Sequence, residues 1–162
     1  MQITDFQPIP EPTIGPSRKI SDSFPHIQSP ILPIPRFVIM ANFQAVGEQF
    51  VTFYYSSFDT NRDSLRALYN EFSMLTFEGE QHRGVDGIMT KIKSMSFQTI
   101  KHQITTMDCQ PSSTANGIIV FVSGFMQMDQ DNPFKFSQVF HLNQQADGHY
   151  FVFNDMFRLA LG

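Results

Sequence analysis

Residues 134–142, FKFSQVFHL, and residues 150–159, YFVFNDMFRL, alternate large apolar side chains with polar ones over most of their length. Alternation with a period of two is typical of β-strands that bury one face. A polar stretch containing Asp147-Gly148 joins the two runs, and Asp-Gly is a common hairpin-turn sequence. We therefore predict a long antiparallel hairpin in this part of the chain.

Asp155 interrupts the apolar side of the second run. Counting by twos places it between Phe153 and Phe157, on a face that we expect to be buried. A carboxylate in apolar surroundings is costly unless it has a partner. We expect a structural salt bridge with Arg158 or another basic residue, and the alternative is an acid/base pair with His102 inside a cavity.

Two more strands are predicted before the hairpin, at residues 99–108 and 118–128. The first of them alternates so that four side chains share one face: Ile100, His102, Ile104 and Thr106. A loop with Gln110-Pro111-Ser112-Ser113 separates the two strands. The second half of the chain therefore reads as four long antiparallel strands.

Helical periodicity dominates the region before these strands. A helix is predicted from Ala41, because apolar side chains recur at steps of three and four: Phe43, Val46, Phe50, Phe53 and Tyr54. A second, short helix follows with Thr60 as its cap, and a third is predicted over residues 85–95. A short strand over residues 74–78, stopped by Gly79, lies between the second and third helices.

This order, with helices before strands, predicts an α+β fold in which helices lie on one face of a strongly bent antiparallel sheet. A bent sheet wrapped on helices forms a cone whose mouth collects loops and strand ends. We therefore expect a pocket at that mouth.

The amino-acid composition excludes some classes of partner for this chain. At 162 residues, 41% hydrophobic and 16% charged, the chain suits one globular domain, and its 18 Phe and 9 Met without Trp suit either an apolar pocket or simply a Phe-rich core. The net charge of −4 without a Lys/Arg cluster argues against nucleic acid and anionic membranes as partners. Cys109 is the only cysteine, which excludes an intrachain disulfide.

Residues 1–39 differ from the rest, since eight of the ten prolines lie there without strand or helix periodicity. We predict a disordered proline-rich extension over 1–39 and one domain over 40–162. The alternative is a true start at Met40.

No motif for phosphate binding, nucleophilic catalysis or a metal site appears in the sequence, and the five histidines are scattered. We therefore expect no cofactor and no metal. Of the histidines, only His102 and His141 fall in predicted strands.

Five segments carry a resemblance to a known family, and together they extend from Met40 to the end of the chain. They are Tyr54-Tyr55 with Phe58-Asp59, residues 74–79 (MLTFEG), residues 97–105, residues 136–142 and residues 153–159. These segments closely resemble the nuclear transport factor 2 family. The resemblance implies a conical α+β fold that forms homodimers through its sheets.

The resemblance also implies carriage rather than catalysis. Relatives bind the GDP form of the small GTPase Ran and the phenylalanine-glycine repeats of nuclear pore proteins, and return Ran to the nucleus. They act in the cytoplasm, in the nucleus and at the pore. Larger relatives serve messenger-RNA export, but no RNA-recognition module follows before Gly162. A cavity enzyme of the isomerase or dehydratase type remains the alternative for this fold.

Site residues carry over by position. The resemblance implies a Ran-binding rim of Glu78, Asp129, Asp131 and His102. It implies a cavity wall for an aromatic side chain of Ran, formed by Phe77, Met95, Ile100, Phe121, Met156 and Phe157. Phe43 matches an aromatic residue that contacts the phenylalanine-glycine repeats.

Overall fold

The structure, a computed structural model, describes residues 43–113 and 116–160. The extension predicted over residues 1–39 and the alternative start at Met40 lie outside these residues. In chain order the elements are α2 (Phe43–Thr60), the 3₁₀ helix η1 (Arg62–Leu68), β1 (Met74–Phe77), β2 (Glu80–Arg83), α3 (Gly84–Lys93), β3 (Ile100–Pro111), β4 (Ile118–Met128), β5 (Phe134–Gln144) and β6 (Tyr150–Leu159).

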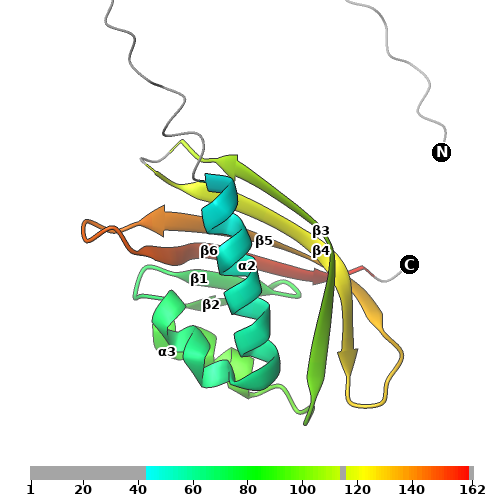
Figure 1. The fold of residues 1–162 in the computed structure, drawn as a ribbon. Helices are drawn as coiled ribbons and strands as arrows, with labels where there is room; N and C mark the ends of the chain where they lie inside the picture. The colour runs from blue at the N-terminus through cyan, green and yellow to red at the C-terminus, as the bar shows by residue number, and fades with distance from the viewer. Residues whose placement is uncertain (1–42, 114–115, 161–162) are drawn as a thin grey trace, which may run out of the picture. The chain divides into compact units, whose positions relative to one another are not determined.

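One six-stranded sheet has the order β2-β1-β6-β5-β4-β3 and bends around α2 (Figure 1). The four long strands pair antiparallel with one another, as predicted. The short β1 pairs parallel with β6. The sheet is therefore mixed, whereas we expected a purely antiparallel one. The sequence-based reading also missed β2, whose residues are all polar because it forms an outer edge of the sheet.

The helix α2 lies in the concave side of the sheet and supplies much of the core (Figure 1). Its buried stripe runs through Gly47, Phe50, Val51, Tyr54, Tyr55 and Phe58. Phe53, which we expected on this stripe, is 48% exposed, because the stripe turns around the helix away from it. A Cβ at Gly47 would lie 2.3 Å from the Cys109 Sγ atom, so this glycine lets α2 approach β3.

The second helix is a single stretch of 3₁₀ helix, and its cap differs from the prediction. Asn61 accepts a hydrogen bond from the Asp63 backbone N–H at 3.2 Å, whereas the Thr60 hydroxyl bonds to the Ser56 carbonyl within α2. Helix α2 therefore extends through the residue that we expected to begin η1.

Two β-bulges change which side chains face the core. Between Ile104 and Thr106 the register of β3 against β4 shifts by one residue. Thr106 is therefore exposed, and Met107 and Cys109 continue the inner face of β3. The prediction that Thr106 shares a face with His102 was wrong for this reason.

The second bulge lies in β6, where Val152 pairs with Leu142 and Asn154 pairs with His141. Phe153 is the extra residue, and its ring lies 5.8 Å from that of His141. Val152 and Asp155 are buried instead, so the expected row of Phe153, Asp155 and Phe157 does not form. Within the described residues, no helix is long and apolar enough to cross a bilayer.

Candidate functional site: an apolar cavity with an acidic mouth

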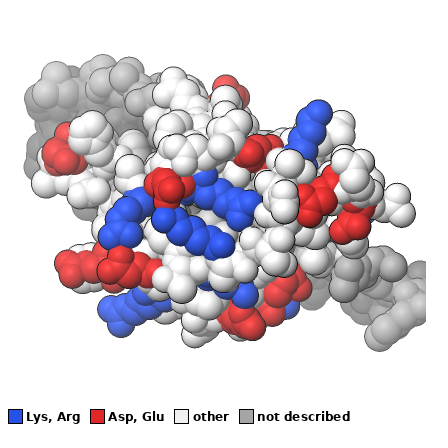
Figure 2. All heavy atoms as spheres, turned by 90° about the horizontal axis from the view of Figure 1, so that it is seen from below, with Lys and Arg blue, Asp and Glu red and all other residues white. Residues whose placement is uncertain are grey.

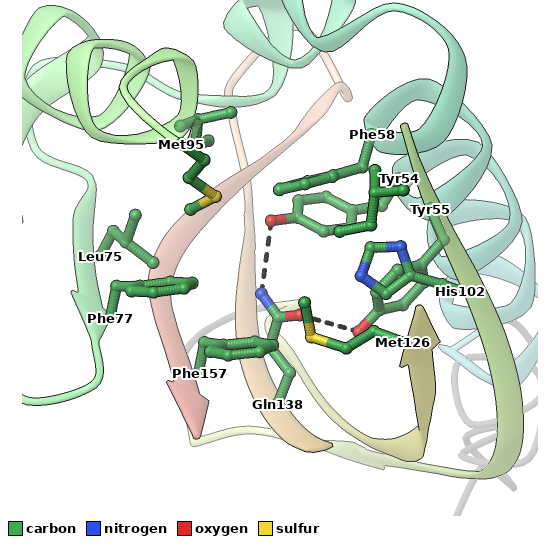
Figure 3. Close-up of a pocket in the computed structure, with 12 residues that line it drawn as sticks. Tyr54, Tyr55, Phe58, Leu75, Phe77, Met95, His102, Met126, Gln138 and Phe157 are labelled. Carbon is green, nitrogen blue, oxygen red and sulfur yellow. Dashed lines mark hydrogen bonds between the residues drawn. The ribbon is translucent and has the colours of Figure 1, made fainter. Parts of the chain in front are cut away.

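A cavity lies between the inner face of the sheet, the last turns of α2, and α3 (Figure 3). Its volume, including the part open to solvent, is about 370 Å³. The lining residues are Tyr54, Tyr55, Phe58, Leu75, Phe77, Ile92, Met95, Ile100, His102, Met126, Gln138 and Phe157.

Four of the six residues predicted for the cavity wall are in this lining: Phe77, Met95, Ile100 and Phe157. The rings of Phe77 and Phe157 stack with centroids 4.7 Å apart, because β1 and β6 pair in parallel at this position. The side chains nearest the mouth are thus aromatic and thioether groups, which bury apolar surface without requiring hydrogen bonds.

The other two residues, Phe121 and Met156, are not part of the cavity. They are 39% and 49% exposed and lie on the opposite, outer face of the sheet. Strand side chains alternate between faces, so Val120 and Val122 occupy the inner positions of β4 around Phe121. On the outer face, Phe121 pairs with Val139 and Val139 pairs with Met156, which places an apolar row across three adjacent strands.

His102 belongs to the cavity wall, as its alternation with Ile100 and Ile104 predicts, and not to the rim that the resemblance implies. Its side chain is only 3% exposed and packs against the rings of Tyr55, Phe58 and Phe136. Its partner is Asp59, whose Oδ1 lies 2.6 Å from His102 Nδ1. The alternative pairing of His102 with Asp155 is therefore not formed.

Asp155 is fully buried behind the cavity, and neutral side chains hold it. Its carboxylate accepts hydrogen bonds from the Gln138 amide at 2.7 Å and from the hydroxyls of Tyr69 at 2.8 Å and Tyr54 at 3.3 Å. The expected salt bridge with Arg158 does not form, because the Arg158 side chain is exposed and the described partners of Asp155 are all neutral.

Burial raises the pKa of Asp155 from its ordinary value of 3.8 to about 6. Burial also raises the pKa of Tyr54 and Tyr69 well above the ordinary value, with the charge of Asp155 adding to the effect, so both phenols keep their protons and act as donors. Gln138 extends the network to the cavity, where its carbonyl oxygen accepts the Tyr55 hydroxyl at 2.8 Å.

Three carboxylates lie next to segments that line the cavity. Glu78 follows Phe77 in the turn between β1 and β2, and Asp129 and Asp131 lie in the loop after β4. Glu78 accepts the Leu159 backbone N–H at 2.5 Å. All three side chains are exposed, so they place negative charge next to segments that line the cavity.

Asp129 also has a structural role at this edge. Its Oδ1 accepts the backbone N–H groups of Thr99 at 2.8 Å and of Gln98 at 3.0 Å, just before β3 begins. The Thr99 hydrogen bond holds the pKa of Asp129 below its usual range. The side chain of Asp131 makes no hydrogen bond within residues 43–113 and 116–160, so its charge is available to a partner.

Three basic side chains of η1 and α3 are paired with carboxylates. Figure 2, seen from below the view of Figure 1, shows basic side chains at the centre of the face with acidic ones around them. Arg66 pairs with Asp86, Lys93 with Asp63, and Lys91 with Glu80. These pairs cancel most of the basic charge on η1 and α3. In the described ranges, no three His, Cys, Asp or Glu side chains gather as a metal site.

Phe43 is the first residue of α2, at the other end of the helix from Asp59 (Figure 1). Sixteen residues of α-helix span about 24 Å, so Phe43 is remote from the cavity. It is half-buried against the core and leaves part of its ring accessible.

The chain is similar to known proteins over most of its described residues. Residues 46–159 match the nuclear transport factor 2 (NTF2) domain. The chain is 53% identical over 116 residues to nuclear transport factor 2B of Arabidopsis thaliana, covering 71% of this chain and 92% of that one. It is 49% identical over 121 residues to nuclear transport factor 2 of Emericella nidulans, with coverages of 74% and 97%.

A solved structure agrees with these relatives. Nuclear transport factor 2 from Cryptosporidium parvum superposes with a TM-score of 0.71 at 47% identity, covering 74% of this chain and 96% of that one. These relatives are named as transport factors and not as enzymes. On its sequence match, its fold and its structural neighbour, the chain belongs to the nuclear transport factor 2 family.

Proposed function

We propose that this protein is a nuclear import carrier. It binds the GDP-bound form of the small GTPase Ran and phenylalanine-glycine repeats of nuclear pore proteins, and it returns Ran to the nucleus. Membership of a family of transport factors supports this proposal, as does an apolar cavity that opens among exposed carboxylates. The carrier works in the cytoplasm, in the nucleus and at the nuclear pore.

Ran binds at the cavity in this proposal. An aromatic side chain of Ran enters between Phe77, Phe157 and Met95, where it gains apolar burial. Basic side chains of Ran meet Glu78, Asp129 and Asp131 at the mouth. Such rim charges speed the encounter and fix its orientation, and their effect weakens with salt.

Two revisions of the site follow from the geometry. His102 contributes to the wall and not to the rim. Phe121 and Met156 leave the Ran site and instead form, with Val139, the centre of an outer surface through which we propose that two copies dimerise. An exposed row of large apolar side chains is typical of an interaction surface.

The phenylalanine-glycine repeats bind near Phe43. Its partly accessible ring supports this assignment, and its separation from the cavity keeps the two partners apart. The homodimer is part of this site, because family members form their repeat-binding groove between two subunits.

A capture experiment with Ran loaded with GDP or with GTP tests the proposal. We expect selective capture of the GDP form by the full chain. Asp131→Lys should weaken this capture roughly tenfold, since it reverses a rim charge that no internal hydrogen bond uses. Glu71→Lys, a reversal of an exposed carboxylate outside the cavity lining, is the matched control. Equal capture of both nucleotide forms, or no effect of Asp131→Lys, would contradict the proposal.

A further inference from the structure

Asp59 contacts His102 at two points. Its Oδ2 accepts the His102 backbone N–H at 2.9 Å, and its Oδ1 lies 2.6 Å from His102 Nδ1. Asp59 is the next-to-last residue of α2, and His102 lies near the start of β3. This clamp therefore joins the end of the helix to the edge strand of the sheet, beside the cavity.

The two contacts determine which nitrogen of the His102 imidazole ring carries the proton. The backbone N–H is always a donor, so it occupies Oδ2 and leaves Oδ1 for the ring. A carboxylate oxygen only accepts, so Nδ1 carries the hydrogen. Neutral His102 then has a lone pair on the other nitrogen, Nε2.

This second nitrogen faces the cavity. The His102 ring projects from β3 into the space between Tyr54, Gln138 and Phe157, with Nε2 at its tip (Figure 3). Nε2 makes no hydrogen bond with any described residue. The hydroxyl of Tyr55 and the amide of Gln138, by contrast, bond to each other. A ligand in the cavity therefore meets Nε2 as an accessible polar atom in a wall that is otherwise mostly apolar.

We propose that Asp59 is a positioning residue for the Ran site: it holds His102 in the Nδ1–H tautomer, so that the cavity presents a hydrogen-bond acceptor to the aromatic side chain that docks there. The edge of an aromatic ring carries partial positive charge, which suits a lone pair and opposes an N–H group. The binding part of this inference rests on the proposed function. The assignment of the Nδ1–H tautomer to His102 does not depend on the proposed function.

Asp59→Asn separates positioning from simple packing. The asparagine has one acceptor oxygen, and the His102 backbone N–H requires it. The NH₂ group then faces Nδ1, which can only accept, so the proton moves to Nε2. Shape is preserved while the atom facing the cavity changes from acceptor to donor. Asp108→Asn, an exposed carboxylate on the same strand, is the control.

Nitrogen NMR of the full chain reads the tautomer directly. We expect Nδ1–H in the wild type and in Asp108→Asn, and Nε2–H in Asp59→Asn. Binding of GDP-loaded Ran should weaken roughly three- to tenfold in Asp59→Asn only, as for loss of one hydrogen-bonding interaction.

An Nε2–H tautomer in the wild type would overturn the inference, and this measurement needs no substitution if Asp59→Asn fails to fold. An inverted tautomer with undiminished Ran binding would overturn the role in binding. Absence of Ran binding by the wild type would instead reject the proposed function, while the tautomer still decides whether Asp59 positions the ring.

Discussion

The Tyr69 hydroxyl donates a hydrogen bond to the Asp155 carboxylate at 2.8 Å, and this contact joins the end of η1 to β6 in the core. Both residues are buried, since Tyr69 is 5% exposed and Asp155 is 0% exposed. A buried carboxylate whose partners are all neutral makes stability depend on pH.

We expect the free energy of unfolding to decrease as pH rises through the range between the two pKa values of Asp155. The unfolded chain releases this proton near pH 3.8 and the folded chain near pH 6, so the folded state binds more protons in between. The destabilisation from ionising buried Asp155 is absent below the pKa of the unfolded chain. It grows between the two pKa values and reaches its full size above the pKa of the folded chain. Its full size is about 3 kcal/mol.

Urea denaturation at a series of pH values measures this contribution. Asp155→Asn should flatten the dependence across the window, because the side chain no longer titrates. Asp147→Asn removes an exposed carboxylate in the β5–β6 turn and should leave the slope as in the wild type. A wild-type stability that rises through the window would show that Asp155 is not the dominant titrating group.

Tyr69→Phe should destabilise the fold by about 1–3 kcal/mol at neutral pH, because it removes a donor from a buried acceptor. The midpoints of denaturant unfolding measure this loss. The control is Tyr150→Phe, since the Tyr150 hydroxyl makes no hydrogen bond among the described residues. The control should change stability by less than about 0.5 kcal/mol. Equal effects of the two substitutions would mean that the Asp155 network contributes little.

Phe121→Arg should convert the proposed dimer to a monomer, because it places a charge in the centre of the outer apolar row. Light scattering with size-exclusion chromatography measures the mass. Phe53→Arg, at a similarly exposed phenylalanine on α2, should leave the mass unchanged. If Phe121→Arg and the wild type have the same mass, the outer face of the sheet is not the dimer surface.

Phe43→Ala should weaken capture on immobilised phenylalanine-glycine repeats several-fold, in keeping with the loss of a partly buried aromatic contact. Capture of GDP-loaded Ran should stay at the wild-type level, since the two sites lie at opposite ends of α2. Phe72→Ala, at a phenylalanine that is 59% exposed, is the control. Loss of both activities together would indicate a global defect rather than a separate repeat site.

Much of the fold was predictable because its elements are long and strongly periodic. The helix over Phe43–Thr60 and the strands β4, β5 and β6 all appear within a few residues of the expected bounds. The short edge strand β2 was missed, since a polar stretch of four residues carries no apolar period.

The errors inside the site come from features that periodicity does not encode. The bulge at Phe153 changes which residues of β6 face the core, and nothing in the local sequence marks it. The partners of Asp155 and His102 come from other elements: Gln138 from β5, Tyr54 and Asp59 from α2, and Tyr69 from the end of η1. Their identity therefore depends on tertiary packing. Asp59 carried no functional signal of its own in the sequence, because an acidic residue at a helix end is usually solvated.

Gly124 lies opposite the bulge in β3, and a Cβ there would lie 2.2 Å from the Gln103 carbonyl oxygen. The two strands approach closely at this point because one side chain is missing. Residue 124 does not line the cavity, yet any larger residue would force β3 away from β4 and relax the curvature that encloses the pocket. The spacing of β3 and β4, and with it the shape of the pocket, thus depends on a position outside the cavity lining.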